Sequence, residues 1–287
     1  MKEVEQEIVR VNCLRHIYPD RTEIAICGLA FTIRRGERVA VLGPNGSGKT
    51  TLLSHIMGLL EPVEGLVEVF GRSPKKDFRE VSKRIGVVFQ NADEQIIGPT
   101  VMDDVAFAPL NHGLPSSEVK TLVEAIMREL DIWHLRDKIP HYLSGGEQKK
   151  VAVAGAMVMK PDLLILDEPF TGLDPKSRVE MVNLMNSLNA RYGTALVITT
   201  HDMDLIPQIA DQVYILNRGH LVLKGKPEEV LTRADVLREA CLEPPILVDL
   251  FYRLSAAGLP VEPVVSAADA VRQLVELYQG DRMRSTF

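Results

Sequence analysis

The segment Gly43-Pro44-Asn45-Gly46-Ser47-Gly48-Lys49-Thr50 constrains the fold more than any other part of the chain, because it has the spacing GxxxxGK[ST]. The apolar stretch 38–42 precedes it and predicts a buried strand. Residues 49–60 follow it, carry apolar side chains at helical spacing and predict a helix. A glycine-rich turn can match this pattern by coincidence, but the flanking strand and helix are the context that a phosphate-binding loop requires.

Such a loop points successive backbone N–H groups, together with the positive end of a helix dipole, at one phosphate group. We expect Lys49 to reach the β- and γ-phosphates of a nucleotide and the Thr50 hydroxyl to coordinate Mg²⁺. The sequence therefore predicts an ATP and Mg²⁺ site. Its predicted nucleotide-binding residues are Gly43, Pro44, Asn45, Gly46, Ser47, Gly48, Lys49, Thr50 and Thr51.

Strand patterns alternate with helical ones along the chain, which predicts an α/β fold with a mostly parallel sheet. Residues 91–159 are mainly helical in pattern and predict a helical subdomain inserted into the sheet. Residues 233–287 predict a short C-terminal extension with helices near 246–257 and 267–279. Further strands are expected at 66–70, 85–89, 163–166, 195–199, 213–216 and 221–223, the last two joined by a hairpin turn at 217–219.

Two carboxylates, Asp167 and Glu168, follow the apolar strand 163–166. The carboxyl ends of parallel strands are where ligands bind in open α/β sheets. We expect Asp167 to hold Mg²⁺ and Glu168 to orient and deprotonate the attacking water. The alternative is an acidic cap on the helix that begins at Pro175, a role that Asp174 fits better.

The charge, the cysteines and the apolar segments of the chain argue against several other classes of protein. The chain has 33 basic and 39 acidic residues and a net charge of −6, which argues against a nucleic-acid partner. The three cysteines are far apart and are expected to be buried small side chains in a reducing cytosol. Residues 1–5 lack the apolar core of a signal peptide. The longest apolar run, 151–159, is far short of the roughly 20 residues of a membrane helix, so the chain is not expected to span a membrane.

Four further motifs accompany the P-loop and the Asp167–Glu168 pair. Leu143-Ser144-Gly145-Gly146-Glu147 is similar to the signature LSGGQ, with Glu in the last position. Gln90 ends a predicted strand, Asp174 follows Gly172-Leu173, and His201 follows the predicted strand 195–199. With all six motifs in order, residues 4–232 resemble the ABC ATPase family. The resemblance implies a P-loop NTPase (RecA-like) fold with an N-terminal β-subdomain, in a cassette over residues 1–232.

The resemblance also assigns roles. Glu168, His201 and Gln90 would act in hydrolysis, Thr50, Gln90 and Asp167 would hold Mg²⁺, and Tyr18 would place its ring under adenine. Ser144, Gly145 and Gly146 precede a second helix start, and Asp174 lies in the matching D-loop. In the family, this signature completes the P-loop of a second subunit, which implies a homodimer or a heterodimer with a paralogue. Taken alone, Ser144 and Glu147 could simply form a capping box.

Two classes of ABC ATPase compete with each other: transporter subunits, and proteins of DNA repair, chromosome structure or translation. The second class would show long coiled coils or two cassettes in one chain, but the sequence has no sustained heptads and one P-loop. A binding module without activity is disfavoured because the expected ATPase residues are all present. The sequence therefore predicts an ATPase coupled to transport.

Residues 89–101 and 104–111 resemble the energy-coupling-factor subfamily, apart from Ala92, where proline is usual. The stretch 237–245 is similar to the cobalt and nickel members. The resemblance implies a peripheral subunit at the cytoplasmic face of the cell membrane. Its partners would be an integral-membrane coupling subunit and a substrate-binding membrane component. The implied cargo is cobalt or nickel ion, with a vitamin as the alternative.

Overall fold

The computed structural model describes residues 7–284, so the segment 1–5 discussed above lies outside the described residues. Ten strands in this range form one curled, mostly parallel sheet of order β3-β1-β2-β10-β9-β4-β8-β7-β6, with β5 paired to β1. The strands are β1 Glu7–Ile17, β2 Glu23–Gly28, β3 Phe31–Arg34, β4 Arg38–Leu42, β5 Glu64–Val69, β6 Ile85–Val88, β7 Leu163–Asp167, β8 Ala195–Thr199, β9 Gln212–Asn217 and β10 His220–Gly225.

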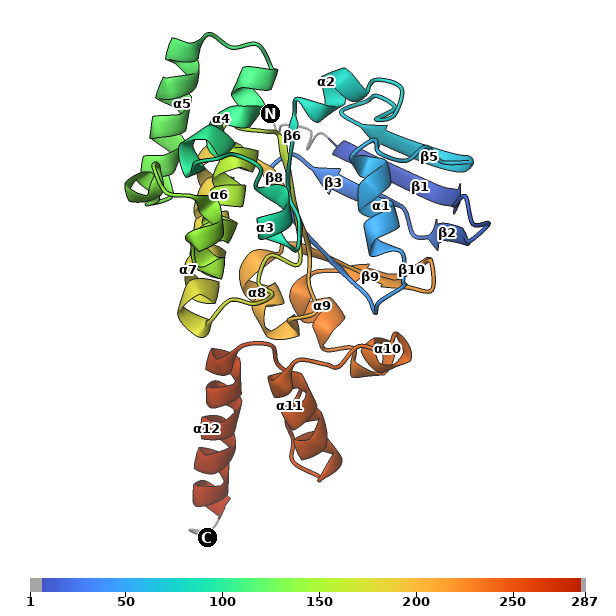
Figure 1. The fold of residues 1–287 in the computed structure, drawn as a ribbon. Coiled ribbons are helices and arrows are strands. Elements are labelled where there is room, and N and C mark those ends of the chain that lie inside the picture. Colours follow the sequence, from blue (N-terminus) through green and yellow to red (C-terminus); the bar gives the residue numbers. More distant parts are fainter. Residues whose placement is uncertain (1–6, 285–287) are drawn as a thin grey trace, which may run out of the picture.

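Helices cover this sheet and continue beyond it (Figure 1). The α-helices are α1 Lys49–Ile56, α2 Phe78–Ser82, α3 Ala92–Gln95, α4 Val101–Asn111, α5 Ser116–Glu129, α6 Gly145–Met157, α7 Pro175–Tyr192, α8 Ile206–Ile209, α9 Pro227–Leu231, α10 Ala234–Glu239, α11 Ile246–Ala256 and α12 Ala267–Arg284. Short 3-10 turns lie at Trp133–Leu135, Pro140–Tyr142 and Met203–Leu205. Among the described helices, none is long and apolar enough to cross a bilayer.

The central strands are buried on both faces, and β4 shows how. Its side chains alternate, so Val39 and Val41 pack with α1 and the N-terminal strands, whereas Ala40 and Leu42 join the core under α4 to α8. All four are fully buried. In Figure 1 the helices α4–α7 lie on one side of the molecule, and β1, β2, β3 and β5 lie on the other. The P-loop connects β4 to α1, and α1 packs on the side of the N-terminal strands.

The predicted parallel strands are present, and their register explains how the motifs meet. β4 pairs in parallel with β8, β8 with β7, and β7 with β6. The predicted hairpin is also confirmed: β9 and β10 pair antiparallel across Arg218 and Gly219, which both have positive φ values of 47° and 78°. The residues that follow β4, β6, β7 and β8 therefore emerge at one edge of the sheet.

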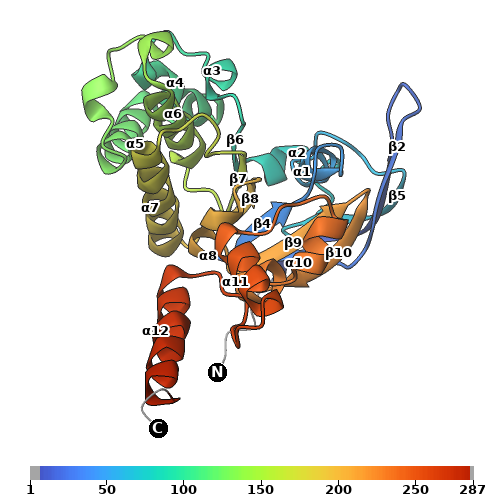
Figure 2. The ribbon, with the colours of Figure 1, turned by 90° about the horizontal axis from the view of Figure 1, so that it is seen from below.

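The N-terminal strands form the β-subdomain that was expected only from the family resemblance. β1 pairs antiparallel with β2, β3 and β5. The stretch 91–159 carries α3 to α6 and no strand in the described chain. After β10 the chain continues into α9–α12. A small third core of Phe251, Val261 and Ala270 holds α11 and α12 together, and Figures 1 and 2 show α12 projecting away from the sheet.

The expectation that all three cysteines are buried thiols is wrong. Cys13 and Cys27 form a disulfide between β1 and β2, with their Cα atoms 4.1 Å apart. The adjacent pair Leu14 and Ile26 lies in register across the same two strands, so the antiparallel pairing places the two cysteines opposite each other. Cys241 is a free thiol and is exposed. Sequence spacing gave no sign of the pair because strand pairing, rather than a local motif, brings the two residues together.

Candidate functional site

The loop between β4 and α1 has the tight curvature that its glycines predict. A Cβ atom on Gly43 would lie 2.2 Å from the carbonyl oxygen of Leu216, so a larger side chain would displace the neighbouring strand β9. Gly46 and Gly48 have φ values of 76° and 106°, which glycine adopts without the steric cost that other residues incur. The loop backbone can therefore wrap around a phosphate group.

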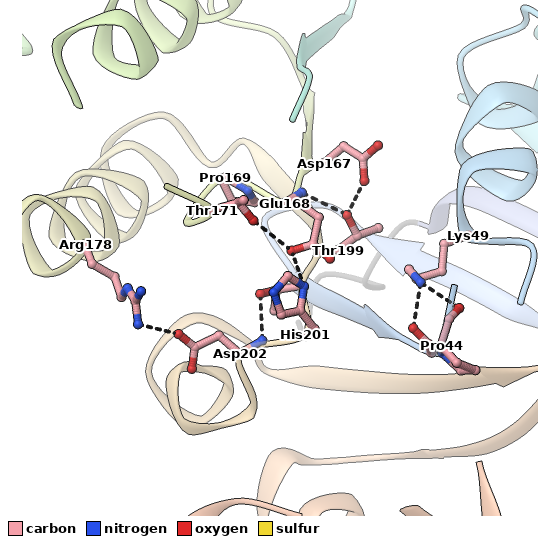
Figure 3. A network of polar contacts seen from close by, with 12 residues as sticks. Pro44, Lys49, Asp167, Glu168, Pro169, Thr171, Arg178, Thr199, His201 and Asp202 are labelled. Atoms are coloured by element: carbon pink, nitrogen blue, oxygen red, sulfur yellow. Dashed lines mark hydrogen bonds and ion pairs between the residues drawn. The ribbon is translucent and has the colours of Figure 1, made fainter. Parts of the chain in front are cut away.

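Lys49 lies over this loop. Its Nζ donates to the carbonyl oxygens of Gly43 and Pro44, at 2.6 Å and 3.0 Å. Burial lowers the pKa of this ammonium group, and the nearby carboxylates of Glu168 and Asp167 oppose that shift. Figure 3 shows Lys49 on one side of the site and the two carboxylates on the other. A phosphate group placed between them would meet a cation already held in position.

A cavity of about 710 Å³ brings the predicted residues together. Besides the P-loop and Thr51, its lining includes Gln90, Asp167, Glu168 and His201. These four residues follow or end β6, β7 and β8, so the parallel register described above places them beside the loop after β4. The structure thus brings these predicted residues together, and the role of each one stays a prediction.

Thr199, at the end of β8, binds the carboxylate of Asp167 and the backbone of Glu168. The Thr199 hydroxyl donates to Asp167 Oδ1 and accepts from the backbone N–H of Glu168 at 3.1 Å. Asp167 and Thr199 are direct partners in the β7–β8 register. Sequence reasoning missed Thr199, although a hydroxyl residue that ends the neighbouring strand was the available signal.

Glu168 has an unusual backbone conformation, with φ 48°. Its Oε2 lies 3.0 Å from His201 Nδ1 and 3.5 Å from the Thr171 hydroxyl (Figure 3). The Glu168 side chain is 13% exposed, whereas that of His201 is 72% exposed. A carboxylate held at the cavity wall next to an exposed imidazole can orient a water molecule and accept its proton.

Two observations indicate that the cavity can hold a nucleotide together with Mg²⁺. The hydroxyl oxygen of Ser47 is buried and has no hydrogen-bond partner among the described residues, which leaves it available to a phosphate oxygen. Thr50, Gln90 and Asp167 all line the same cavity, each has a side-chain oxygen, and oxygen is the ligand that Mg²⁺ prefers. These three residues would hold the ion, which neutralises phosphate charge when it is bound.

The signature residues lie elsewhere in the chain. Ser144 caps α6 and forms a complete capping box with Glu147, so the simpler interpretation of this motif is correct as local structure. Asp174 caps α7 by accepting from the backbone N–H groups of Lys176 and Ser177, as the sequence predicted. Neither Ser144, Gly145, Gly146 nor Asp174 lines the P-loop cavity of the same chain. The α6 N-terminus therefore forms a second, separate cluster of predicted nucleotide-binding residues.

Tyr18 also lies outside the cavity lining, beyond the end of β1. Its hydroxyl is 2.9 Å from the Thr51 hydroxyl on α1. Its ring packs edge-on against His16 at 4.5 Å, and His16 packs against His55 at 4.9 Å. The ring thus sits beside the P-loop helix, and the two histidines behind it were not predicted from the sequence.

Comparison with known proteins identifies the family. Residues 26–171 match the family model of the ABC transporter. The chain belongs to the ABC transporter ATP-binding family. It is 39% identical to the energy-coupling factor transporter ATP-binding protein EcfA of Methanothermobacter thermautotrophicus, over 96% of this chain and 88% of that protein. It is 42% identical to EcfA of Methanoculleus marisnigri, over 92% of this chain and 96% of that protein.

A solved structure agrees with the fold. CbiO1 from Clostridium perfringens, described as part of the ABC transporter complex cbiONQ, is similar with a TM-score of 0.75 and 36% identity. The match covers 86% of this chain and all of that chain. The P-loop ABC ATPase fold, the use of ATP with Mg²⁺ and the ATPase activity in transport are thereby established for this chain.

The position of Glu168 generates a direct prediction. Replacement by Gln keeps the size of the side chain and removes the proton acceptor, so hydrolysis is expected to fall by about 10²–10⁴-fold. ATP binding is expected to persist because Lys49 and the P-loop backbone are untouched. Steady-state phosphate release and equilibrium binding of a fluorescent ATP analogue measure the two effects. Wild-type turnover in Glu168→Gln would remove Glu168 from this role.

Proposed function

We propose that this chain is the ATP-driven motor of an energy-coupling-factor transporter and docks on an integral-membrane coupling subunit. One observation carries the proposal: a single short segment after β6 borders both the nucleotide cavity and an apolar groove. Gln90 lines the cavity, whereas Gln95 and Ile97 line the groove. A change at the nucleotide can thus move the groove wall through only a few residues.

The groove lies between β6 and the helices α4 and α6 and has a volume of about 290 Å³. Ile97 and Phe107 expose 64% and 49% of their surface, which is unusual for large apolar side chains. An amphipathic helix of a partner would bury these side chains by the helix-in-groove mode. We assign this groove to a cytoplasmic helix of the membrane coupling subunit, which works with a substrate-binding membrane component.

Hydrogen bonds make the segment a rigid connection. Gln95 accepts from the N–H of Phe89 at 2.9 Å and donates to the carbonyl of Val87 at 2.8 Å, which ties α3 to β6. Asp104 on α4 accepts from the N–H groups of Ile97 and Gly98. The segment is therefore fixed at β6 and at α4, so motion at either end is transmitted to the other.

In the proposed hydrolysis, Glu168 orients the attacking water and takes its proton, and His201 holds Glu168 from the exposed side. Lys49 and the P-loop N–H groups stabilise the charge on the transferred phosphoryl group. Thr50, Gln90 and Asp167 would hold Mg²⁺, which would neutralise further negative charge there. The side chains named here all line the same cavity, which supports the proposal. Positioning and charge neutralisation are the main requirements of phosphoryl transfer.

The active form in this proposal is a dimer, either of two copies or with a paralogue. The N-terminus of α6, with Ser144, Gly145 and Gly146, can bind phosphate but lies outside the cavity of its own chain. A two-fold pairing would bring it to the partner's P-loop and form two identical sites at one interface. Asp174 would lie at the same interface, and the complex would sit at the cytoplasmic face of the membrane.

The dimer can be tested in a Glu168→Gln background, where ATP is expected to persist and hold the two chains together. Adding Ser144→Arg puts a bulky cation where the partner's nucleotide would bind. We expect ATP binding to remain and ATP-induced dimerisation, measured by size-exclusion chromatography with light scattering, to disappear.

Ser117→Arg is the matched control, because Ser117 lies near the start of α5, is exposed and gains the same side chain. It should dimerise normally. Loss of ATP binding together with dimerisation in Ser144→Arg would show instead that Ser144 only supports local folding. If Glu168→Gln alone stays monomeric, the partner is a paralogue.

The groove is tested by Phe107→Asp, which places a charge among apolar contacts. We expect the variant to keep its ATPase activity in isolation and to lose co-purification with polytopic membrane proteins from detergent-solubilised host membranes. Val63→Asp is the control, since Val63 is 56% exposed and lies outside the groove. Equal recovery of the membrane partner by both variants would contradict docking at this groove.

For the cargo we propose a cobalt or nickel ion, on the basis of the resemblance of 237–245 to metal-uptake members. No cluster of His, Cys, Asp or Glu in the described residues could hold a metal ion, so cargo contacts would belong to other subunits. The cargo can change the ATPase rate only through a partner protein that has more than one conformation. Both ATP and the cargo must bind these conformations with different affinities.

Deletion of the gene tests this assignment. Uptake of labelled Co²⁺ or Ni²⁺ at low external metal is expected to fall in the deletion strain, whereas uptake of biotin and riboflavin should stay unchanged. Complementation with the wild-type gene, and not with the Glu168→Gln variant, should restore uptake. Normal metal uptake with lost vitamin uptake would replace the metal by a vitamin and leave the ATPase function intact.

A further inference from the structure

A buried lysine, Lys149, lies in the second turn of α6 and is 6% exposed. Its ammonium donates to three backbone carbonyl oxygens: those of Glu168 at 3.3 Å, Pro169 at 2.9 Å and Thr171 at 2.7 Å. A lysine ammonium has three N–H donors, and here all three are used. Three carbonyls from one turn therefore converge on a single cation.

That turn is the one that carries the carboxylate of the site. It connects β7 to α7, and Figure 3 shows Pro169 and Thr171 next to Glu168. Glu168 has a left-handed backbone with φ 48°, a conformation that persists only when surrounding contacts fix it. Thr199 fixes the N–H side of Glu168, and Lys149 fixes the carbonyl side.

The same lysine is rigidly joined to the signature. Gly145 and Gly146 precede Lys149 by about one helical turn, in a helix whose first turn is closed by a capping box. A Cβ atom on Gly146 would lie 3.1 Å from the Ser177 hydroxyl on α7, so the starts of α6 and α7 are also in close contact. Ser177 in turn donates to Asp174 Oδ2 at 2.7 Å.

The free-energy cost of burying the Lys149 ammonium group has to be compensated by its contacts. Burial lowers the pKa of Lys149, and the charge of Glu168 opposes the shift. An apolar side chain of similar length would fill the space but would remove the lysine donor from the carbonyls of Pro169 and Thr171, whereas the Glu168 carbonyl would keep the backbone N–H of Thr171 at 3.2 Å. The lysine is therefore suited to positioning the turn rather than to packing alone.

We propose that Lys149 is a positioning residue that couples the two ATP sites of the dimer, by holding the turn that carries Glu168 to the helix that presents the signature to the partner's nucleotide. This inference rests on the dimer proposed above. In each chain, docking of α6 onto the partner's ATP moves Lys149, and Lys149 moves the Glu168–Thr171 turn of its own site. Each site then senses the nucleotide of the other, which makes ATP hydrolysis cooperative.

The test compares Lys149→Met with Lys150→Met. The two lysines are adjacent on α6, but the Lys150 side chain pairs with Glu180 on α7 at 2.8 Å, and its described hydrogen bonds and ion pairs do not include the turn. For Lys149→Met we expect kcat to fall by up to about 100-fold, the size of effect that a small misplacement causes. Its affinity for a fluorescent ATP analogue should stay unchanged, and the Hill coefficient for ATP in hydrolysis should fall to about 1. Lys150→Met should keep the wild-type kcat and Hill coefficient.

A second variant guards against misfolding. Lys149→Gln is shorter and keeps two donors, so its kcat should lie between those of wild type and Lys149→Met, with ATP affinity unchanged. If Lys149→Met fails to fold, Lys149→Gln carries the test alone. Wild-type kcat and cooperativity in these variants, or loss of ATP affinity in parallel with kcat, would overturn the coupling role.

Dimer formation is measured separately in the Glu168→Gln background, with and without Lys149→Met. ATP-induced dimerisation in both, together with the kinetic changes above, supports the inference. Absence of dimers already in Glu168→Gln would refute the homodimer itself. Intact dimers combined with unchanged kinetics in Lys149→Met would refute only the role of Lys149.

Discussion

The parallel register of β6, β7, β8 and β4 is the constraint on which the site depends. Parallel strands end at the same edge, so residues that follow them meet even when they are far apart in the sequence. This places the P-loop after β4, Gln90 after β6, Asp167 and Glu168 at the end of β7 and His201 after β8 around one cavity. The buried apolar cores on both faces of the sheet hold this edge in position.

Cations and hydroxyl groups around Glu168 then set the local geometry. Thr199 binds the Asp167 carboxylate and the backbone N–H of Glu168, and Lys149 donates to the carbonyls of Glu168, Pro169 and Thr171. Lys49 approaches from the opposite loop. The turn that carries Glu168 is thus fixed from two elements, by Thr199 at the end of β8 and by Lys149 on α6. The residues proposed for hydrolysis and the helix that carries the signature are therefore joined by direct hydrogen bonds.

Local sequence chemistry predicted much of this arrangement. The strand 163–166, the P-loop between strand and helix, the 217–219 hairpin and the caps by Asp174 and Ser144 all appear in the structure. Each depends on residues within a few positions of one another, so that periodicity and turn or cap preferences are sufficient. The family match over residues 26–171 includes four of the six motifs: the P-loop, Gln90, the signature and the Asp167–Glu168 pair.

The sequence by itself determined the chemistry of this protein: a P-loop, a glutamine, two carboxylates and a histidine follow one another along the chain and are typical of an ATPase. Only the tertiary structure decided which other groups hold these residues in position. The Cys13–Cys27 disulfide, the contact between Thr199 and Asp167, and the three carbonyls on Lys149 all join residues 14 to 32 positions apart. Their proximity depends on strand order and on the packing of α6 against the β7–α7 turn. No periodic or local pattern encodes such contacts, because they exist only once the sheet has formed.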